Sequence, residues 1–149
     1  MNPYNLREAL LAKHAQHVVL IHFPIALFLA GVIFDFAAYF TKRSALAAAA
    51  YYNFVVAAIS TVPVVATGLL AWQFQLEGQR LKGILLQHLL LGLTSSVMIC
   101  VTWYMHFRSR RASEQTPPRF RLPVELVAVA IIVMTAHLGG YLTGVNIPS

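Results

Sequence analysis

Four long apolar segments divide the chain, and they constrain its fold more than any other feature of the sequence. They cover residues 17–40, 45–74, 83–107 and 123–145. An α-helix needs about 20 residues to cross the roughly 30 Å hydrocarbon core of a bilayer, whereas a barrel strand needs only about 10. Because all four segments have helical length, the sequence predicts an all-α integral membrane protein. We expect a four-helix bundle with antiparallel, up-and-down topology and both chain ends on one side of the membrane.

The composition supports a membrane protein and disfavours several other classes. Of the 149 residues, 58% are hydrophobic and only 11% are charged, and the mean hydropathy is +0.67. Soluble domains contain about 25% charged residues. The net charge of +6 does not suggest nucleic acid here, because most Lys and Arg residues lie between apolar segments. We therefore expect one domain, residues 1–149, in contact with the lipid bilayer. There is no nucleotide-binding loop, nucleophile elbow or carboxylate pair, so the sequence favours an electron-transfer or accessory subunit over an enzyme.

The loops between the segments predict the orientation. The loops on one side contain Lys42, Arg43, Arg108, Arg110, Arg111, Arg119 and Arg121, and the other side has only Arg7, Lys13, Arg80 and Lys82. Loops rich in Lys and Arg remain in the cytoplasm. The sequence therefore predicts a multi-pass protein of the inner (cytoplasmic) membrane with both termini in the periplasm.

Histidines inside the apolar segments are the strongest functional signal. Ionisable side chains are costly within a bilayer and usually mark functional sites. His22 and His88 each lie five residues from the same predicted membrane surface, at a depth of about 7–8 Å. His137 lies about 12 Å below that surface, and His17 stands at the mouth of the first segment. Antiparallel packing would bring all four to one end of the bundle, whereas His106 lies at the opposite end.

Imidazoles from several helices at one depth are typical of a membrane haem b. Facing histidines are its usual axial ligands, and bundles build such sites from inward side chains on facing helices. Glycines at the same level would leave room for the flat porphyrin. We therefore predict a haem b site formed by His17, His22, His88, His137, Gly68, Gly139 and Gly140. The predicted metal ligands within this set are His22, His88 and His137.

Two other interpretations remain open. A lone intramembrane histidine often serves as a hydrogen-bond partner between helices, and glycines often serve only helix packing. The chain could then be a cofactor-free structural or assembly subunit, or it could bind a metal ion or handle protons through its histidines. Asp35, toward the other end of the first segment, is interpreted as structural, with Arg43 as its candidate partner. Thr135 is expected to orient an imidazole.

The first segment opens with HVVLIHFPIAL, from His17 to Leu27. This resembles HPxxVHFPIAL, the opening motif of the DUF2231 family of predicted bacterial membrane proteins. The pieces TGLLAW (residues 67–72), His88 and LGG (residues 138–140) are similar to later helices of that family. Two departures are that Val18 replaces the usual proline and that the tail lacks the His-Gly element common after the Gly-Gly pair.

The resemblance implies a bacterial membrane protein with a redox function, because similar modules appear beside c-type cytochromes or quinoprotein dehydrogenases. Together with the histidines, it leads us to expect an electron-transfer subunit that binds haem b within a larger respiratory or photosynthetic complex. The expected partners are other membrane or periplasmic redox subunits, with a quinone as a further candidate.

Overall fold

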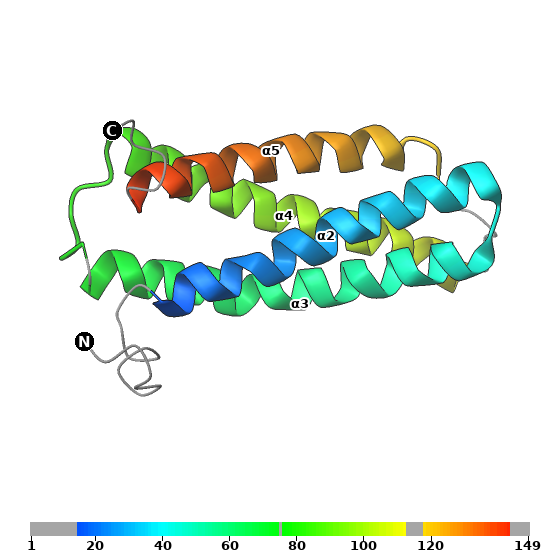
Figure 1. Ribbon diagram of the computed structural model, residues 1–149, viewed down its shortest axis with the longest axis horizontal. Coiled ribbons are helices and arrows are strands. Elements are labelled where there is room, and N and C mark those ends of the chain that lie inside the picture. Colours follow the sequence, from blue (N-terminus) through cyan, green and yellow to red (C-terminus); the bar gives the residue numbers. More distant parts are fainter. Residues whose placement is uncertain (1–14, 75, 113–117, 144–149) are drawn as a thin grey trace.

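The computed structural model describes residues 15–74, 76–112 and 118–143, and this part of the chain forms four long helices (Figure 1). Helix α2 covers Ala15–Thr41, α3 covers Ser44–Phe74, α4 covers Gly83–Arg111 and α5 covers Arg121–Leu142. All four are long and apolar enough to cross a membrane. The prediction of an all-α bundle of four membrane-spanning helices is confirmed. The predicted end of the fourth segment, residue 145, and the predicted loop charges Arg7 and Lys13 lie outside the described residues.

Short turns follow α2 and α3. Helix α2 ends where Lys42 adopts a left-handed conformation (φ 59°) and its N–H donates to the carbonyl oxygen of Ala38, 2.8 Å away. This is a common way to end a helix. Between α3 and α4, Gly78 has a φ of 63°, which glycine adopts without a steric penalty. The indole N–H of Trp72 donates to the carbonyl oxygen of Gln79 at 2.9 Å, so this turn is tied to the end of α3.

The bundle consists of two antiparallel helix pairs. Helix α2 packs most extensively against α3, and α4 against α5, while the contact between α3 and α4 is smaller and that between α2 and α5 is slight. Helices α2 and α4 begin, and α3 and α5 end, at the same end of the bundle (Figure 1). We call this the histidine end, because it contains His17, His22, His88 and His137. The opposite end, which contains Arg108, Arg110, Arg111 and Arg121, is the arginine end.

The tightly packed core lies in the part of the bundle nearer the arginine end. Buried residues begin at Pro24 in α2 and at Ser95 in α4, and they stop at Thr61 in α3 and at Ile132 in α5. The described residues between these four positions and the histidine end are all half-buried or exposed. Side chains therefore pack tightly between the helices in the half of the bundle nearer the arginine end, and much less tightly at the histidine end.

Two phenylalanines form the centre of this core. The rings of Phe28 on α2 and Phe54 on α3 are completely buried, and their centroids lie 5.4 Å apart. Gly31 allows this close packing, because a Cβ atom there would lie only 2.7 Å from the Phe54 ring. The most extensive helix contact, between α2 and α3, is therefore built on a small residue facing an aromatic ring, a pattern common in membrane bundles.

Candidate functional site

Two of the four histidines at the histidine end are held between helices. His17 on α2 is half-buried, and its Nδ1 lies 3.2 Å from the hydroxyl oxygen of Thr67 on α3. His88 on α4 is also half-buried, and its Nδ1 lies 3.1 Å from the carbonyl oxygen of Thr135 on α5. The two rings are close enough for their charges to interact. Each helix pair therefore contributes one histidine to the same region.

The other two histidines lie on the outer surface. His22 is exposed, and its Nδ1 lies 2.6 Å from the carbonyl oxygen of Val18 in the same helix. His137 is also exposed, and its ring meets the Tyr141 ring edge-on with centroids 5.1 Å apart. Of the three predicted metal ligands, the structure therefore holds only His88 between helices.

The hydrogen bonds determine which nitrogen of each neutral ring is available to a ligand. A carbonyl oxygen can only accept, so Nδ1 of His88 donates to Thr135. The Thr67 hydroxyl donates to the carbonyl oxygen of Pro63 at 2.8 Å, so it accepts from Nδ1 of His17. The lone pair of each neutral ring is then on Nε2, and the backbone of Val64 also interacts with the imidazole of His17. Metal-binding histidines are commonly oriented in this way.

Glycines make space for both rings. A Cβ atom at Gly68 would lie 2.9 Å from Cε1 of His17, and one at Gly139 would lie 3.1 Å from Cε1 of His88. The first distance is shorter than real Cβ contacts, and the second is tighter than most of them, so a side chain at either position would push against an imidazole. In the structure Gly68 and Gly139 leave room for the imidazoles, and their expected role beside a porphyrin stays a prediction. Gly140 is half-buried, and its carbonyl oxygen accepts from the Thr143 hydroxyl at 3.2 Å.

Thr135 connects α5 to α4 through two of its atoms. Its carbonyl oxygen accepts from His88, and its hydroxyl forms a hydrogen bond of 3.0 Å with the hydroxyl of Ser95. Thr135 was expected to orient an imidazole, and the ring it contacts is that of His88 on the neighbouring helix.

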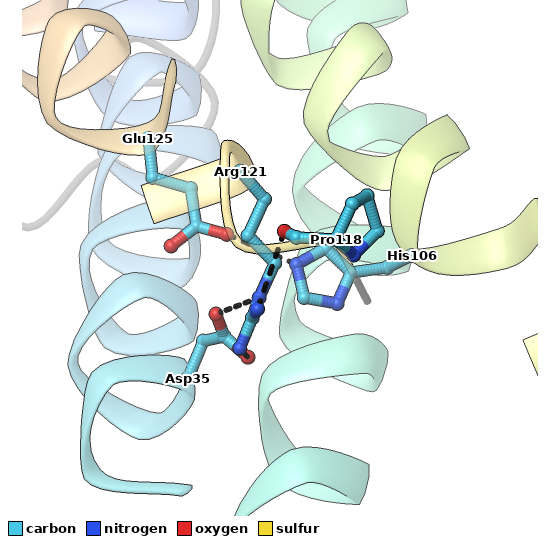
Figure 2. A network of polar contacts seen from close by, with 5 residues as sticks. All are labelled: Asp35, His106, Pro118, Arg121 and Glu125. Atoms are coloured by element: carbon cyan, nitrogen blue, oxygen red, sulfur yellow. Dashed lines mark hydrogen bonds and ion pairs between the residues drawn. The ribbon is translucent and has the colours of Figure 1, made fainter. Parts of the chain in front are cut away.

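Four ionisable side chains are buried together at the arginine end (Figure 2). Nε of Arg121 donates to Oδ2 of Asp35 at 2.6 Å, and its Nη2 donates to Oδ1 at 3.3 Å. Nε2 of His106 lies 3.0 Å from Oε1 of Glu125. All four residues are at most 3% exposed. This cluster joins three helices, because Asp35 is on α2, His106 on α4, and Arg121 and Glu125 on α5.

The start of α5 positions this cluster. The carbonyl oxygen of Pro118 accepts from the backbone N–H of Arg121 at 3.1 Å and lies 3.4 Å from its Nη1, so the guanidinium is held on the first turn. Glu125 follows one turn later on the same face. On α4, the ring of His106 packs against Phe54 with centroids 4.8 Å apart. The three carboxylate and imidazole groups have one ligand atom each within 4.8 Å of one another.

The sequence analysis missed most of this cluster. It counted Arg121 as a loop charge and proposed Arg43 as the partner of Asp35, but Arg121 lies in α5 and binds Asp35. The reason is topological, since α2 ends and α5 begins at the same end of the bundle. Glu125 was overlooked, although it is the only acidic residue in the fourth apolar segment. An ionisable residue at such a position is itself a signal of function.

The fold and these two polar clusters define a four-helix transmembrane protein that holds histidines and a buried ion pair between its helices. The chain belongs to the DUF2231 family of predicted membrane proteins, whose family model matches residues 13–145. The resemblance noted in the sequence is thereby confirmed. No curated protein and no solved structure matches the chain.

Proposed function

We propose that this protein binds haem b at its histidine end and transfers electrons as a subunit of a larger respiratory or photosynthetic complex. His17 and His88 would hold the haem iron in this proposal. The observation that carries it is that two half-buried imidazoles on separate helix pairs are each held through Nδ1, which places the lone pair of the neutral ring on Nε2. Imidazole nitrogen is a suitable ligand for haem iron.

The packing of the bundle supports a cofactor at this end. The buried core stops at Thr61 and Ile132, before the level of the two histidines. Helices α2 and α5, which belong to different pairs, touch only slightly. A planar group between the two pairs would therefore not require the core to be broken. A bound haem would supply one-electron redox chemistry, and the chain would hold and orient it.

The proposal assigns different ligands from those favoured by the sequence. His22 and His137 are exposed, whereas His17 and His88 are half-buried and each contacts a neighbouring helix through Nδ1. The cofactor-free alternative explains the bonds from His17 and His88 as simple interhelical contacts. It gives no reason for both rings to form their interhelical contact through the same nitrogen and to be backed by a glycine, and we therefore favour haem.

Spectroscopy of the purified protein tests the proposal. A reduced-minus-oxidised spectrum should contain the α band of a b-type haem. His17→Ala and His88→Ala should each abolish this band, because the iron would lose one of the two imidazoles that hold it. His22→Ala and His137→Ala are matched controls from the same end of the bundle and should retain it.

Two results would contradict the proposal. One is the absence of haem from wild-type protein produced with sufficient haem. The other is loss of haem from the two control variants with retention in His17→Ala and His88→Ala, which would assign the ligands to the exposed histidines.

The cationic residues also support an orientation. Lys42, Arg43, Arg108, Arg110 and Arg111 lie at the arginine end, so we place that end in the cytoplasm of a bacterial cell. The haem would then lie near the periplasmic surface, within reach of periplasmic redox subunits or a membrane quinone. A reporter that works only in the periplasm should be active when fused after Ser149. Activity of a cytoplasmic reporter at the same position would reverse this orientation.

A further inference from the structure

We propose that the His106–Glu125 pair is a proton-binding site within the membrane. Glu125 holds an exchangeable proton as a neutral carboxylic acid, and its O–H donates to Nε2 of His106. This site lies at the arginine end and does not depend on the haem proposed for the opposite end.

The charges of the cluster require one proton on this pair. Asp35 and Arg121 neutralise each other through two hydrogen bonds. If Glu125 were ionised beside a neutral His106, the cluster would contain an uncompensated negative charge. A buried charge of this kind is very costly, and proteins usually avoid it by protonation. One proton shared by Glu125 and His106 makes the whole cluster neutral.

The two oxygens of Glu125 identify it as the group that carries the proton. Oε1 lies 3.0 Å from Nε2 of His106, whereas Oε2 is buried and has no hydrogen-bond partner among the described residues. A carboxylate ion needs donors at both oxygens, but the neutral acid has one O–H that needs a single acceptor. Nε2 of a neutral imidazole is such an acceptor. The geometry therefore fits the acid better than the ion.

The groups around the pair favour this placement of the proton over an imidazolium ion. From α2 and α5, His106 faces the compensated pair of Asp35 and Arg121. On its own helix, the cation of Arg110 lies within electrostatic range of His106, and it also covers the Tyr51 ring at 4.3 Å. Helix α3 contributes the uncharged ring of Phe54 against the imidazole. A third positive charge on His106 would thus lie near two arginines and an apolar ring.

A metal ion is the main rival ligand. Asp35, His106 and Glu125 together offer donors that a divalent cation prefers. However, the guanidinium of Arg121 already binds both oxygens of Asp35 (Figure 2). A metal ion would have to displace this buried cation or remain beside it. The Arg121 guanidinium is therefore the cation of this cluster, and the ligand that we assign to the His106–Glu125 pair is a proton.

The site is close enough to the membrane surface to exchange its proton. His106 lies five residues before Arg111, the last residue of α4, which is about 7–8 Å along the helix axis. Glu125 lies four residues after Arg121, the first residue of α5, and is thus about 6 Å from that helix end. Protons can reach the pair from the arginine end without crossing the apolar core around Phe28.

Infrared spectroscopy of the full chain in lipid tests this proposal directly. The carbonyl stretch of a neutral carboxylic acid is separate from the bands of a carboxylate ion. At neutral pH, the wild-type protein should show this stretch with the intensity of one acid per chain. Transfer to D₂O should shift the band, because the acidic proton exchanges. Asp35 and Glu125 are the only acidic residues within the four described helices, so the assignment is simple.

Two substitutions assign the band. Glu125→Gln should remove it, whereas Glu77→Gln, which changes an exposed acid in the turn between α3 and α4, should leave it unchanged. If Glu125→Gln does not accumulate, Glu125→Asp provides a second variant, in which the acid remains and its band changes frequency. These measurements use the protein with or without haem, so the haem proposal and the proton site can fail separately.

Four outcomes would overturn the proposal. They are the absence of the acid band from the wild-type protein, its persistence in Glu125→Gln, its failure to shift in D₂O, and tight binding of added Zn²⁺ with loss of the band. The last result would identify the cluster as a metal site instead.

Discussion

The ion pair between Asp35 and Arg121 should be the most sensitive polar contact in the protein. Both side chains are almost fully buried, and Arg121 donates to both carboxylate oxygens. Arg121→Met keeps much of the apolar stem but leaves the charge of Asp35 buried without its partner. Removing one member of a buried ion pair costs about 3–5 kcal/mol. We expect this loss in the free energy of unfolding of Arg121→Met, and a similar loss in Asp35→Leu.

The double variant Asp35→Leu/Arg121→Met decides whether the loss of the ion pair causes the destabilisation of the two single variants. If the two losses were independent, they would sum to roughly 6–10 kcal/mol. When both charges are removed together, no buried charge is left, and such replacements are often neutral or even stabilising by about 1–4 kcal/mol. Asp35→Leu/Arg121→Met should therefore be at least as stable as the wild type, and much more stable than either single variant.

Reversible unfolding in mixed micelles, followed by far-UV circular dichroism, measures these differences. Arg119→Met is a matched control, since Arg119 lies two residues earlier and is exposed. It should change the unfolding free energy by less than about 0.5 kcal/mol. The reasoning is refuted if Arg121→Met costs no more than Arg119→Met, or if the double variant loses the sum of the two single losses.

Two further predictions concern packing and hydrogen bonding between helices. Gly31→Ala should destabilise the protein by about 1–3 kcal/mol, because the new Cβ would lie 2.7 Å from the Phe54 ring. Gly92→Ala is its control, since the nearest atom there would be 3.8 Å away, and the same unfolding assay should detect little loss. Thr135→Val should cost about 1–3 kcal/mol by leaving the buried Ser95 hydroxyl without its partner on α5. Equal stability of Gly31→Ala and Gly92→Ala, or of Thr135→Val and wild type, would contradict the respective prediction.

The number of helices and the ends at which the histidines gather were readable from the sequence, because segment length and connectivity decide both. The rotation of each helix about its own axis, which decides which side chains face the interior, was not readable from the sequence. His17 and His22 are five residues apart, which separates them by about 140° around an α-helix. Only one of them can face the interior. In a soluble bundle an apolar stripe would show which one, but lipid is as apolar as the core, so this signal is weak in a membrane helix.

The spacing of polar residues indicates which face of a helix is turned to the interior, whereas the spacing of apolar residues does not. On α4, four polar residues recur at seven-residue spacing, and the structure buries three of them and half-buries the first: His88, Ser95, Thr102 and Ser109. Seven residues are close to two helical turns, so these residues share one face. The same logic applies to Glu125, four residues after Arg121. Their partners were not readable, because Asp35 is 86 residues from Arg121 and only the packing of α2 and α5 brings them together.

A contact that fixes the two helix pairs at one end of the bundle should also affect their spacing at the other end. At the histidine end the pairs are alike, since each places a histidine against a glycine of its second helix. A ligand between them would meet similar groups from both sides. At the arginine end they differ, and the Asp35–Arg121 bond joins α2 and α5, the two helices of different pairs that touch only slightly. This bond therefore helps to set the separation of the pairs. Asp35 lies about 27 Å from His17 along α2, but breaking its bond to Arg121 should still alter the spacing of the His17 and His88 imidazoles. If these imidazoles hold haem as proposed, the haem content per folded Arg121→Met protein should fall, even under conditions in which the variant remains folded.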